Sequence, residues 1–198
     1  MAATLILVRH AAHGHLDRIL SGRAPGVALS DVGRAQAERL ARRLAARGVD
    51  AVLSSPLDRA AETARAIADA AGIRVEVADA LIEIDLGDWT GRSFDQLRGD
   101  PAWDLWNTER ATARPPGGES MGEAQARIVG YLETVAREND GRTIALVSHS
   151  DMIRAAVAHV LGLGLDHLLR FDIDPASATT LIWGGWGARL HRLNESEN

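Results

Sequence analysis

The sequence contains no cysteine and no lysine. The absence of cysteine excludes disulfides, thiolate metal ligands and cysteine nucleophiles, and with them the cysteine-dependent phosphatases. The absence of lysine excludes Schiff-base enzymes and the phosphate-binding loops that depend on an invariant lysine. All 22 basic residues are arginine, so a bound anion must be held by arginine, histidine or backbone amides.

Long apolar runs are missing as well. No segment approaches the roughly 18 consecutive apolar residues of a membrane span, and residues 1–10 lack the pattern of a secretory signal, so we expect a cytoplasmic protein with no membrane partner. The net charge of -5 gives no electrostatic reason to bind nucleic acid. A chain of 198 residues suits one domain with a small-molecule partner. The oligomeric state stays open, a homodimer included.

Short apolar runs alternate with amphipathic segments along the chain. A continuous run such as "TLILV" is typical of a strand that is buried on both faces. This pattern predicts strands over 4–8, 50–56, 73–78 and 143–147, helices over 31–47, 57–71, 120–138 and 150–161, and a C-terminal hairpin over 177–193. Ser30 and Ser150 are predicted helix N-caps, "SMGE" at 120–123 is a capping box, and Pro56 suits the first turn of its helix.

This alternation predicts an α/β fold, a three-layer, doubly wound and mostly parallel sheet with helices on both faces. Sheets of this kind bind ligands at the carboxyl ends of their strands. Two predicted strand ends carry reactive side chains, Arg9 and His10 at one and Ser148 and His149 at the other. The stretch 82–119 has weak periodicity and holds three of the five tryptophans, which predicts a small helical lid outside the sheet.

Metal binding is one interpretation of the first strand end. His13, His15 and Asp17 form an H-x-H-x-D sequence similar to the loop of dinuclear metallohydrolases. Such a site needs further ligands downstream, but Asp17 is followed by an arginine and the other histidines are scattered. Short motifs of this kind often match by accident. The sequence therefore favours His13 and His15 as polar loop residues and predicts neither a metal ion nor another cofactor.

Phosphate chemistry accounts for more of these residues. A phosphate monoester carries close to two negative charges near neutral pH, so its site needs several fixed donors and a nucleophile. A neutral imidazole such as that of His10 can attack phosphorus if its other ring nitrogen is held by a hydrogen bond. Arg9 and Arg59 can each donate two hydrogen bonds to phosphate oxygens, and His149 can donate another.

Six segments resemble the histidine phosphatase superfamily, also called the phosphoglycerate mutase-like family. In chain order they are "LVRHA" (7–11), "LS..GRAQAERLA" (29–41), "LSSPLDRAAETA" (53–64), "LIEIDLGDWTG" (81–91), "RPPGGES" (114–120) and "VSHSDMIRA" (147–155). They follow the family's order and span nearly the whole chain. The resemblance implies one domain over 1–198, with a lid over about 82–119.

The resemblance also implies a set of site residues. His10 matches the residue that is phosphorylated during turnover, and Arg9, Arg59 and His149 match the residues that surround the phosphate. Glu83 matches the proton donor to the leaving oxygen. A carboxyl group can fill that role when burial or nearby negative charge raises its pKa.

Ser21 and Gly22 match a family loop that contacts phosphate, mainly through its backbone. The chain also departs from the family's pattern. Ala11 replaces a glycine, and alanine fits there only if its φ angle is negative. The residues after it differ too, so the family's substrate contacts in this loop cannot be transferred. Asp151 offers a second carboxyl group and is a weaker candidate for the proton donor.

We therefore predict a metal-independent phosphomonoester hydrolase that acts on a small phosphorylated metabolite through a phosphohistidine intermediate. The family's mutases carry a longer helical excursion than 82–119, which favours hydrolysis over phosphoglycerate mutase activity. Two further hypotheses are a metallohydrolase and a catalytically decayed protein that binds phosphorylated ligands. The chain is also similar to alpha-ribazole phosphate phosphatases, but no residue identifies the substrate.

Overall fold

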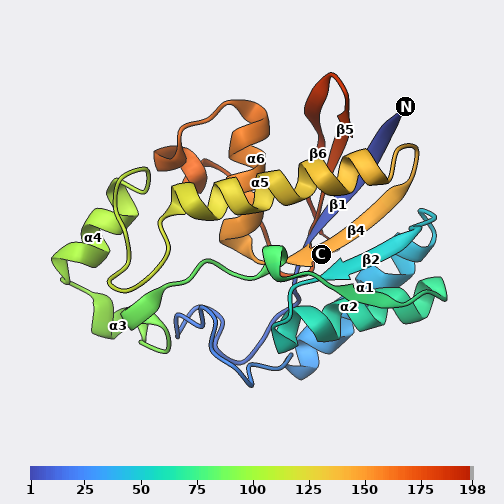
Figure 1. The fold of residues 1–198 in the computed structure, drawn as a ribbon. Helices are drawn as coiled ribbons and strands as arrows, with labels where there is room; N and C mark the ends of the chain where they lie inside the picture. The colour runs from blue at the N-terminus through green and yellow to red at the C-terminus, as the bar shows by residue number, and fades with distance from the viewer. Residues whose placement is uncertain (197–198) are drawn as a thin grey trace.

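The computed structural model describes residues 1–196 and places six strands of this range in one sheet (Figure 1). The strands are β1 (Ala2–Arg9), β2 (Ala51–Ser54), β3 (Val75–Val77), β4 (Thr143–Ser148), β5 (Ala178–Gly184) and β6 (Gly187–Glu195). Their order across the sheet is β3-β2-β4-β1-β5-β6. The first four strands are parallel, and the predicted hairpin adds β5 and β6 antiparallel at one edge, so the sheet is mostly parallel.

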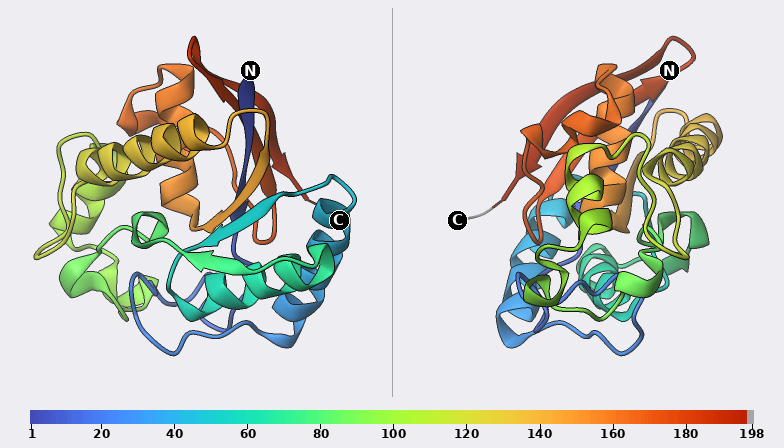
Figure 2. Two further views of the ribbon diagram at one scale, coloured as in Figure 1. Left: turned by 45° about the vertical axis from the view of Figure 1, so that its right-hand side comes forward. Right: turned by 90° about the vertical axis from the view of Figure 1, so that its left-hand side faces the viewer.

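Helices cover both faces of the sheet, which confirms the predicted three layers (Figures 1 and 2). The covering helices are α1 (Asp31–Ala45) and α2 (Asp58–Ala71) on one face and α5 (Met121–Glu138) and α6 (Ser150–Leu161) on the other. Successive side chains of a strand point to opposite faces. In β1, Leu5 and Leu7 therefore pack into the core beneath α5 and α6, whereas Ile6 and Val8 pack against α1 and α2.

Serine caps begin two of these helices as predicted. The Ser30 hydroxyl accepts a hydrogen bond from the Gly33 N–H at the start of α1. Ser120 and Glu123 form a reciprocal capping box at the start of α5. Each cap gives backbone N–H groups a partner that the first turn of a helix cannot provide.

Two other expectations about helix starts are wrong. Ser150 does not cap α6, because β4 ends one residue before His149 and α6 begins one residue after it. The single connecting residue, His149, therefore occupies the cap position in an extended conformation. Pro56 lies outside α2, since the chain turns through Leu57, the cap residue, before the helix begins.

The stretch 82–119 leaves the sheet, as expected, and contains only short helices. These are the 3-10 helix η2 (Gly87–Trp89) and the α-helices α3 (Phe94–Leu97) and α4 (Pro101–Thr108). Trp89 and Trp106 are buried with ring centroids 6.1 Å apart, and Trp103 packs edge-on against Trp89. The three tryptophans thus join this excursion to the core on the α5 side of the sheet. Its role as a lid stays a prediction.

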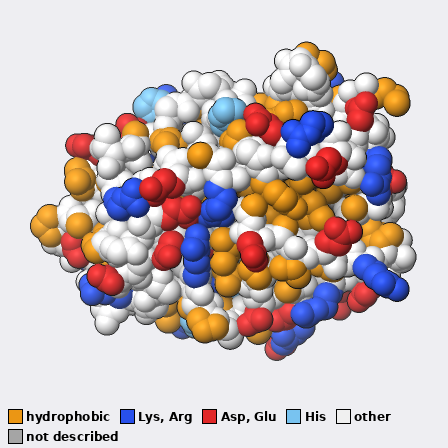
Figure 3. Space-filling view, in the orientation of Figure 1, with side chains coloured by type: hydrophobic (Ala, Val, Ile, Leu, Met, Phe, Trp, Pro, Cys, Tyr) orange, Lys and Arg blue, Asp and Glu red, His pale blue; other side chains and the backbone are white. Residues whose placement is uncertain are grey.

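Charged side chains of both signs are interspersed around an apolar area on the face shown in Figure 3. Among residues 1–196, the structure has no helix with the length and apolar character needed to cross a bilayer. The predicted domain runs over 1–198, and its last two residues lie outside the described range. Its cytoplasmic location and its oligomeric state also stay predictions.

Candidate active site

Two neighbouring strands bring His10 and His149 together. β1 and β4 are parallel and hydrogen-bonded, with Arg9 paired to Ser148, so the residues that follow them leave the sheet side by side. The His10 N–H donates to the Ser148 carbonyl at 3.0 Å. The two imidazole ring centroids are 5.1 Å apart. The predicted pair of strand ends therefore forms one site, at the carboxyl edge of the sheet.

The ring of His10 is held in one tautomer. Its Nδ1 lies 2.9 Å from the Ala11 carbonyl oxygen, and because a carbonyl only accepts, Nδ1 must carry the proton. Nε2 is then an acceptor, and Arg59 Nε donates to it at 3.3 Å. Burial, together with the positive charges of Arg59 and Arg9, lowers the pKa of His10 well below its ordinary value. The imidazole is therefore neutral, with a lone pair on Nε2, at neutral pH.

Two arginines bring buried donors to this site. Arg59, which is 2% exposed, donates from Nη2 to the Gly22 carbonyl at 2.7 Å and lies 3.3 Å from His149 Nδ1. Arg9 donates from Nη1 to the Ile173 carbonyl at 2.6 Å. Arg59 Nη1 and Arg9 Nε are buried without a hydrogen-bond partner. Burial lowers the pKa of both side chains, but arginine keeps its charge at neutral pH. Buried donors of this kind favour a bound anion.

His149 is fully buried and orients Arg59. Its Nδ1 must accept from the guanidinium, so Nε2 carries the proton and donates to Ser55 Oγ at 2.8 Å. Burial, followed by His10 and Arg59, lowers the pKa of His149 well below its ordinary value. A serine hydroxyl can donate or accept, so it is the Arg59 guanidinium, and not Ser55, that decides the tautomer of His149.

Glu83 lies beside this pair of histidines. Its Oε2 is 3.9 Å from His149 Nδ1, and its Oε1 accepts the N–H of Ile84 at 2.9 Å. Burial, and then the negative charge of Asp151, raise the pKa of Glu83 to about 7. Asp151 itself lies 3.4 Å from Arg110 Nη1. A raised pKa close to neutral suits a group that donates and then accepts a proton.

Gly22 contacts the site through its backbone. Its carbonyl holds Arg59, its φ is +46°, and a Cβ atom there would lie 2.7 Å from Thr90 Oγ1, so the position requires glycine. Ser21 is buried, and its Oγ lies 3.3 Å from His15 Nδ1. The structure thus brings Ser21 and Gly22 to the site, while their contact with phosphate stays a prediction.

The loop after His10 is fixed by residues that lie in two of the family-like segments, 29–41 and 53–64, but for which the sequence predicted no role. The Ala11 N–H donates to Thr63 Oγ1 and the Ala12 N–H to Gln36 Oε1, both at 3.0 Å. A Cβ atom on Gly33 would lie 1.9 Å from the Ala12 carbonyl oxygen, so α1 approaches this loop closely. Ala11 is absent from the residues with positive φ, as its side chain requires. In the sequence, these residues could have been noticed as small or polar side chains on the inward-facing side of a predicted helix.

His13 faces the same site, as a loop residue. It is 8% exposed, and its ring centroid is 5.2 Å from that of His10. Its Nδ1 accepts the His15 N–H at 3.3 Å. Burial, followed by the charge of Arg59, lowers the pKa of His13 to about 4, so its ring is neutral. Within residues 1–196, no group of three or more histidine, aspartate or glutamate side chains could hold a metal ion.

A comparison with protein families identifies the chain. The family model of the histidine phosphatase superfamily (branch 1) matches residues 5–196. The chain belongs to this superfamily. Phosphoserine phosphatase 1 of Hydrogenobacter thermophilus is 35% identical over 182 residues, which cover 89% of this chain and 85% of the relative.

Two other members of the superfamily also match this chain over nearly its whole length. The 2,3-bisphosphoglycerate-dependent phosphoglycerate mutase of Brucella anthropi is 32% identical over 88% of this chain and 89% of its own length. The solved structure of a mycobacterial glucosyl-3-phosphoglycerate phosphatase has a TM-score of 0.86 at 29% identity and covers 99% of this chain and 100% of its own. The predicted fold class, family and enzyme class are therefore confirmed. The protein is a phosphatase that acts on small phosphorylated molecules.

Proposed function

We propose that the protein hydrolyses phosphate monoesters without a metal ion, in two steps through a phosphohistidine at His10. The observation that carries the proposal is the state of His10. Its Nδ1–H is tied to the Ala11 carbonyl, its pKa is lowered, and its Nε2 lone pair faces Arg59, whose Nη1 has no partner. A neutral nucleophile and a buried cationic donor therefore meet at one point.

In the first step, His10 Nε2 attacks phosphorus while the bond from phosphorus to the leaving oxygen breaks. Arg59 and Arg9 hold the non-bridging oxygens, where hydrogen bonds from fixed cations stabilise the charge of the transition state. Glu83 transfers its proton to the leaving oxygen, because an alkoxide departs slowly unless it is protonated. The products of this step are a free alcohol, a phosphorylated His10 and a Glu83 carboxylate.

In the second step, the Glu83 carboxylate takes a proton from water. The water oxygen attacks phosphorus, the bond from phosphorus to Nε2 breaks, and inorganic phosphate leaves. His10 is again neutral and Glu83 is again protonated. A carboxyl group with a pKa of about 7 can serve in both directions at neutral pH. The Arg110 contact of Asp151 favours Glu83 over Asp151 as the proton carrier.

The proposal includes a single domain over 1–198 in which 82–119 covers the site. Arg110, which follows α4 within this excursion, lies 3.4 Å from Asp151 on α6 and stacks 4.8 Å from the centroid of the Trp106 ring. This bridge between the excursion and the first turn of α6 supports the role of a lid. The names of the relatives point to phosphoserine and glucosyl-3-phosphoglycerate as substrates to test, and both carry a carboxylate.

The test is phosphate release in excess EDTA. We expect hydrolysis of 4-nitrophenyl phosphate and of at least one of phosphoserine, 3-phosphoglycerate and glucosyl-3-phosphoglycerate, and a base-stable, acid-labile phosphoenzyme in an alkaline quench. Loss of activity in EDTA with recovery in zinc would indicate a metallohydrolase. Binding without a phosphoenzyme would indicate a decayed site. A phosphoglycerate mutase is the second candidate, because the Brucella anthropi relative carries that name. Interconversion of phosphoglycerates in the presence of a bisphosphoglycerate primer would support it.

The pH dependence follows from the state of Glu83. Burial and the charge of Asp151 raise its pKa to about 7, and a proton donor must be protonated. With phosphoserine we expect kcat/KM to fall about tenfold per pH unit above that value. Below neutral pH, His10 stays neutral because its pKa is lowered. The second ionisation of the substrate's phosphate, at about pH 6, therefore limits kcat/KM on the acid side. Glu83→Gln should lower the rate and remove the alkaline fall; a wild-type rate that is flat above neutral pH would contradict the assignment.

A further inference from the structure

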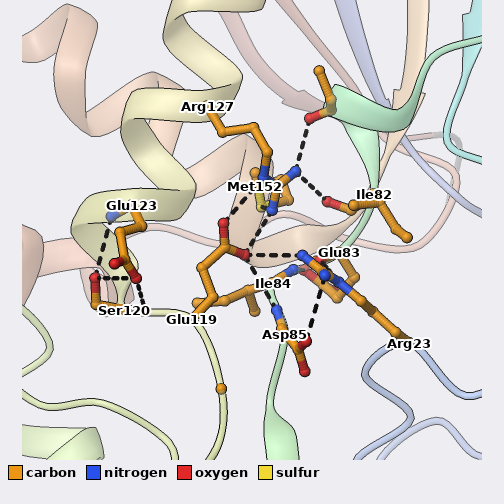
Figure 4. Close-up of polar contacts among 12 residues, drawn as sticks. Arg23, Ile82, Glu83, Ile84, Asp85, Glu119, Ser120, Glu123, Arg127 and Met152 are labelled. Atoms are coloured by element: carbon orange, nitrogen blue, oxygen red, sulfur yellow. Dashed lines mark hydrogen bonds and ion pairs between the residues drawn. The ribbon is translucent and has the colours of Figure 1, made fainter.

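The segment that carries Glu83 has no regular secondary structure. Residues 82–86 connect the 3-10 helices η1 (Asp79–Leu81) and η2 (Gly87–Trp89), so neither a strand ladder nor a helix provides partners for the backbone of this segment. Backbone polar groups that are removed from water must find partners elsewhere. Here many of those partners are side chains from distant parts of the chain, as Figure 4 shows.

Two arginines donate to carbonyl oxygens of this segment and of η1 just before it. Arg127, on α5, places Nη1 2.8 Å from the Ala80 oxygen and 2.9 Å from the Ile82 oxygen. Arg23, in the loop after Gly22, places Nε 2.8 Å from the carbonyl oxygen of Glu83 itself. The backbone is therefore held immediately before Glu83 and at Glu83.

One carboxylate orients both arginines. Glu119 Oε2 lies 3.0 Å from Arg23 Nη2 and 2.8 Å from Arg127 Nη2, and its Oε1 lies 3.1 Å from Arg127 Nε. The backbone N–H of Asp85 lies 3.3 Å from the same Oε2, and the Glu119 N–H donates to the Asp85 carbonyl at 2.8 Å. Glu119 thus fixes the two guanidiniums and also holds the segment beyond Glu83.

We propose that Arg23, Glu119 and Arg127 are positioning residues that hold the Glu83 carboxyl group at hydrogen-bond distance from the leaving oxygen. This inference rests on the proposed function, in which Glu83 is the proton donor. Proton transfer needs heavy atoms about 2.6–3.2 Å apart, and a shift of about 1 Å can cost about 10²-fold in rate. Within residues 1–196, no hydrogen bond joins these three side chains to the side chains of His10, Arg59 or His149, so the network acts through Glu83.

Glu119→Gln tests the network with little change of volume. The amide oxygen can take the place of Oε2, but the amide then places an NH₂ donor opposite Arg127 Nε and removes the negative charge that the two guanidiniums share. We compare two substrates, because 4-nitrophenolate leaves without a proton whereas the alkoxide of serine does not. The expected loss in kcat/KM is about 10- to 100-fold with phosphoserine and less than about threefold with 4-nitrophenyl phosphate. If phosphoserine proves not to be a substrate, glycerol 2-phosphate takes its place.

The matched control is Glu123→Gln, four residues further along the chain, in the first turn of α5. Glu123 pairs with Arg114 at 2.8 Å and completes the capping box with Ser120, which glutamine preserves, and it has no hydrogen bond to the segment around Glu83. We expect both substrates to be hydrolysed at the wild-type rate. Thermal unfolding of each variant separates a local effect from loss of the fold.

A second variant covers the case in which Glu119→Gln does not fold. Arg23→Lys keeps a positive charge beside Glu119 but removes the Nε donor to the Glu83 carbonyl, and we expect the same selective loss, about threefold to tenfold. Equal losses on both substrates, or none, would overturn the network. Glu83→Gln serves as the reference: if it lowers kcat/KM equally on both substrates, the proton-donor role in the proposed function fails, and the network proposal fails with it. The comparison uses kcat/KM because hydrolysis of the phosphoenzyme, in which Glu83 is the base, is common to both substrates and does not enter that ratio.

Discussion

His10→Ala is expected to lower kcat/KM by at least about 10³-fold, or about 4 kcal/mol of activation free energy, and to abolish the phosphoenzyme. The variant loses the only atom proposed to attack phosphorus. Arg59 loses one hydrogen-bond acceptor but keeps the Gly22 carbonyl and the contact with His149. The anion site therefore stays formed, and phosphoserine should still bind, as measured by titration calorimetry.

The control for His10→Ala is His159→Ala. His159 is an exposed histidine in the last turn of α6, so its loss should leave hydrolysis unchanged. Circular dichroism and thermal unfolding of both variants would show whether the buried cavity left by His10 disturbs the sheet. If His10→Ala keeps more than a tenth of the wild-type activity, another group is the nucleophile and the proposed mechanism is wrong.

Arg59→Lys is expected to lower kcat/KM by about 10²- to 10³-fold, mostly through kcat. The guanidinium serves several partners at once, with Nε on His10, Nη2 between Gly22 and His149, and Nη1 unpaired. The single nitrogen of lysine cannot occupy these positions together. Lysine keeps the positive charge, so a loss of rate in this variant would show that the planar arrangement of guanidinium donors contributes more than the charge to stabilising the transition state.

Arg65→Lys provides the matched control for this second prediction. Arg65 lies on the same helix, α2, but is exposed. The substitution should change neither kcat nor KM with 4-nitrophenyl phosphate. A rate for Arg59→Lys within about threefold of wild type would mean that Arg59 is not a direct ligand of the phosphoryl group, since a lost donor of that kind costs far more.

The order of the elements was readable from the sequence because each has a strong local signal. "TLILV" and "TIALV" are apolar on both faces, and the structure buries both faces of β1 and β4. The capping box of Ser120 and Glu123 involves only neighbours in the chain, so its pattern was sufficient to predict the start of α5. The Ser150 cap failed because the length of the connection after β4, and not the residue type, decided which residue occupies the cap.

The chemistry open to this protein follows from its amino-acid sequence alone. It supplied histidines and arginines at strand ends, a glutamate, and neither lysine nor cysteine, and these residues suit phosphate transfer through histidine. The protonation states and positions in which these residues act come from the folded arrangement of the chain. The lowered pKa of His10, the raised pKa of Glu83 and the anchoring of Glu83 by Glu119 all depend on burial and on charges from distant segments. Packing sets those quantities, and local sequence does not encode them.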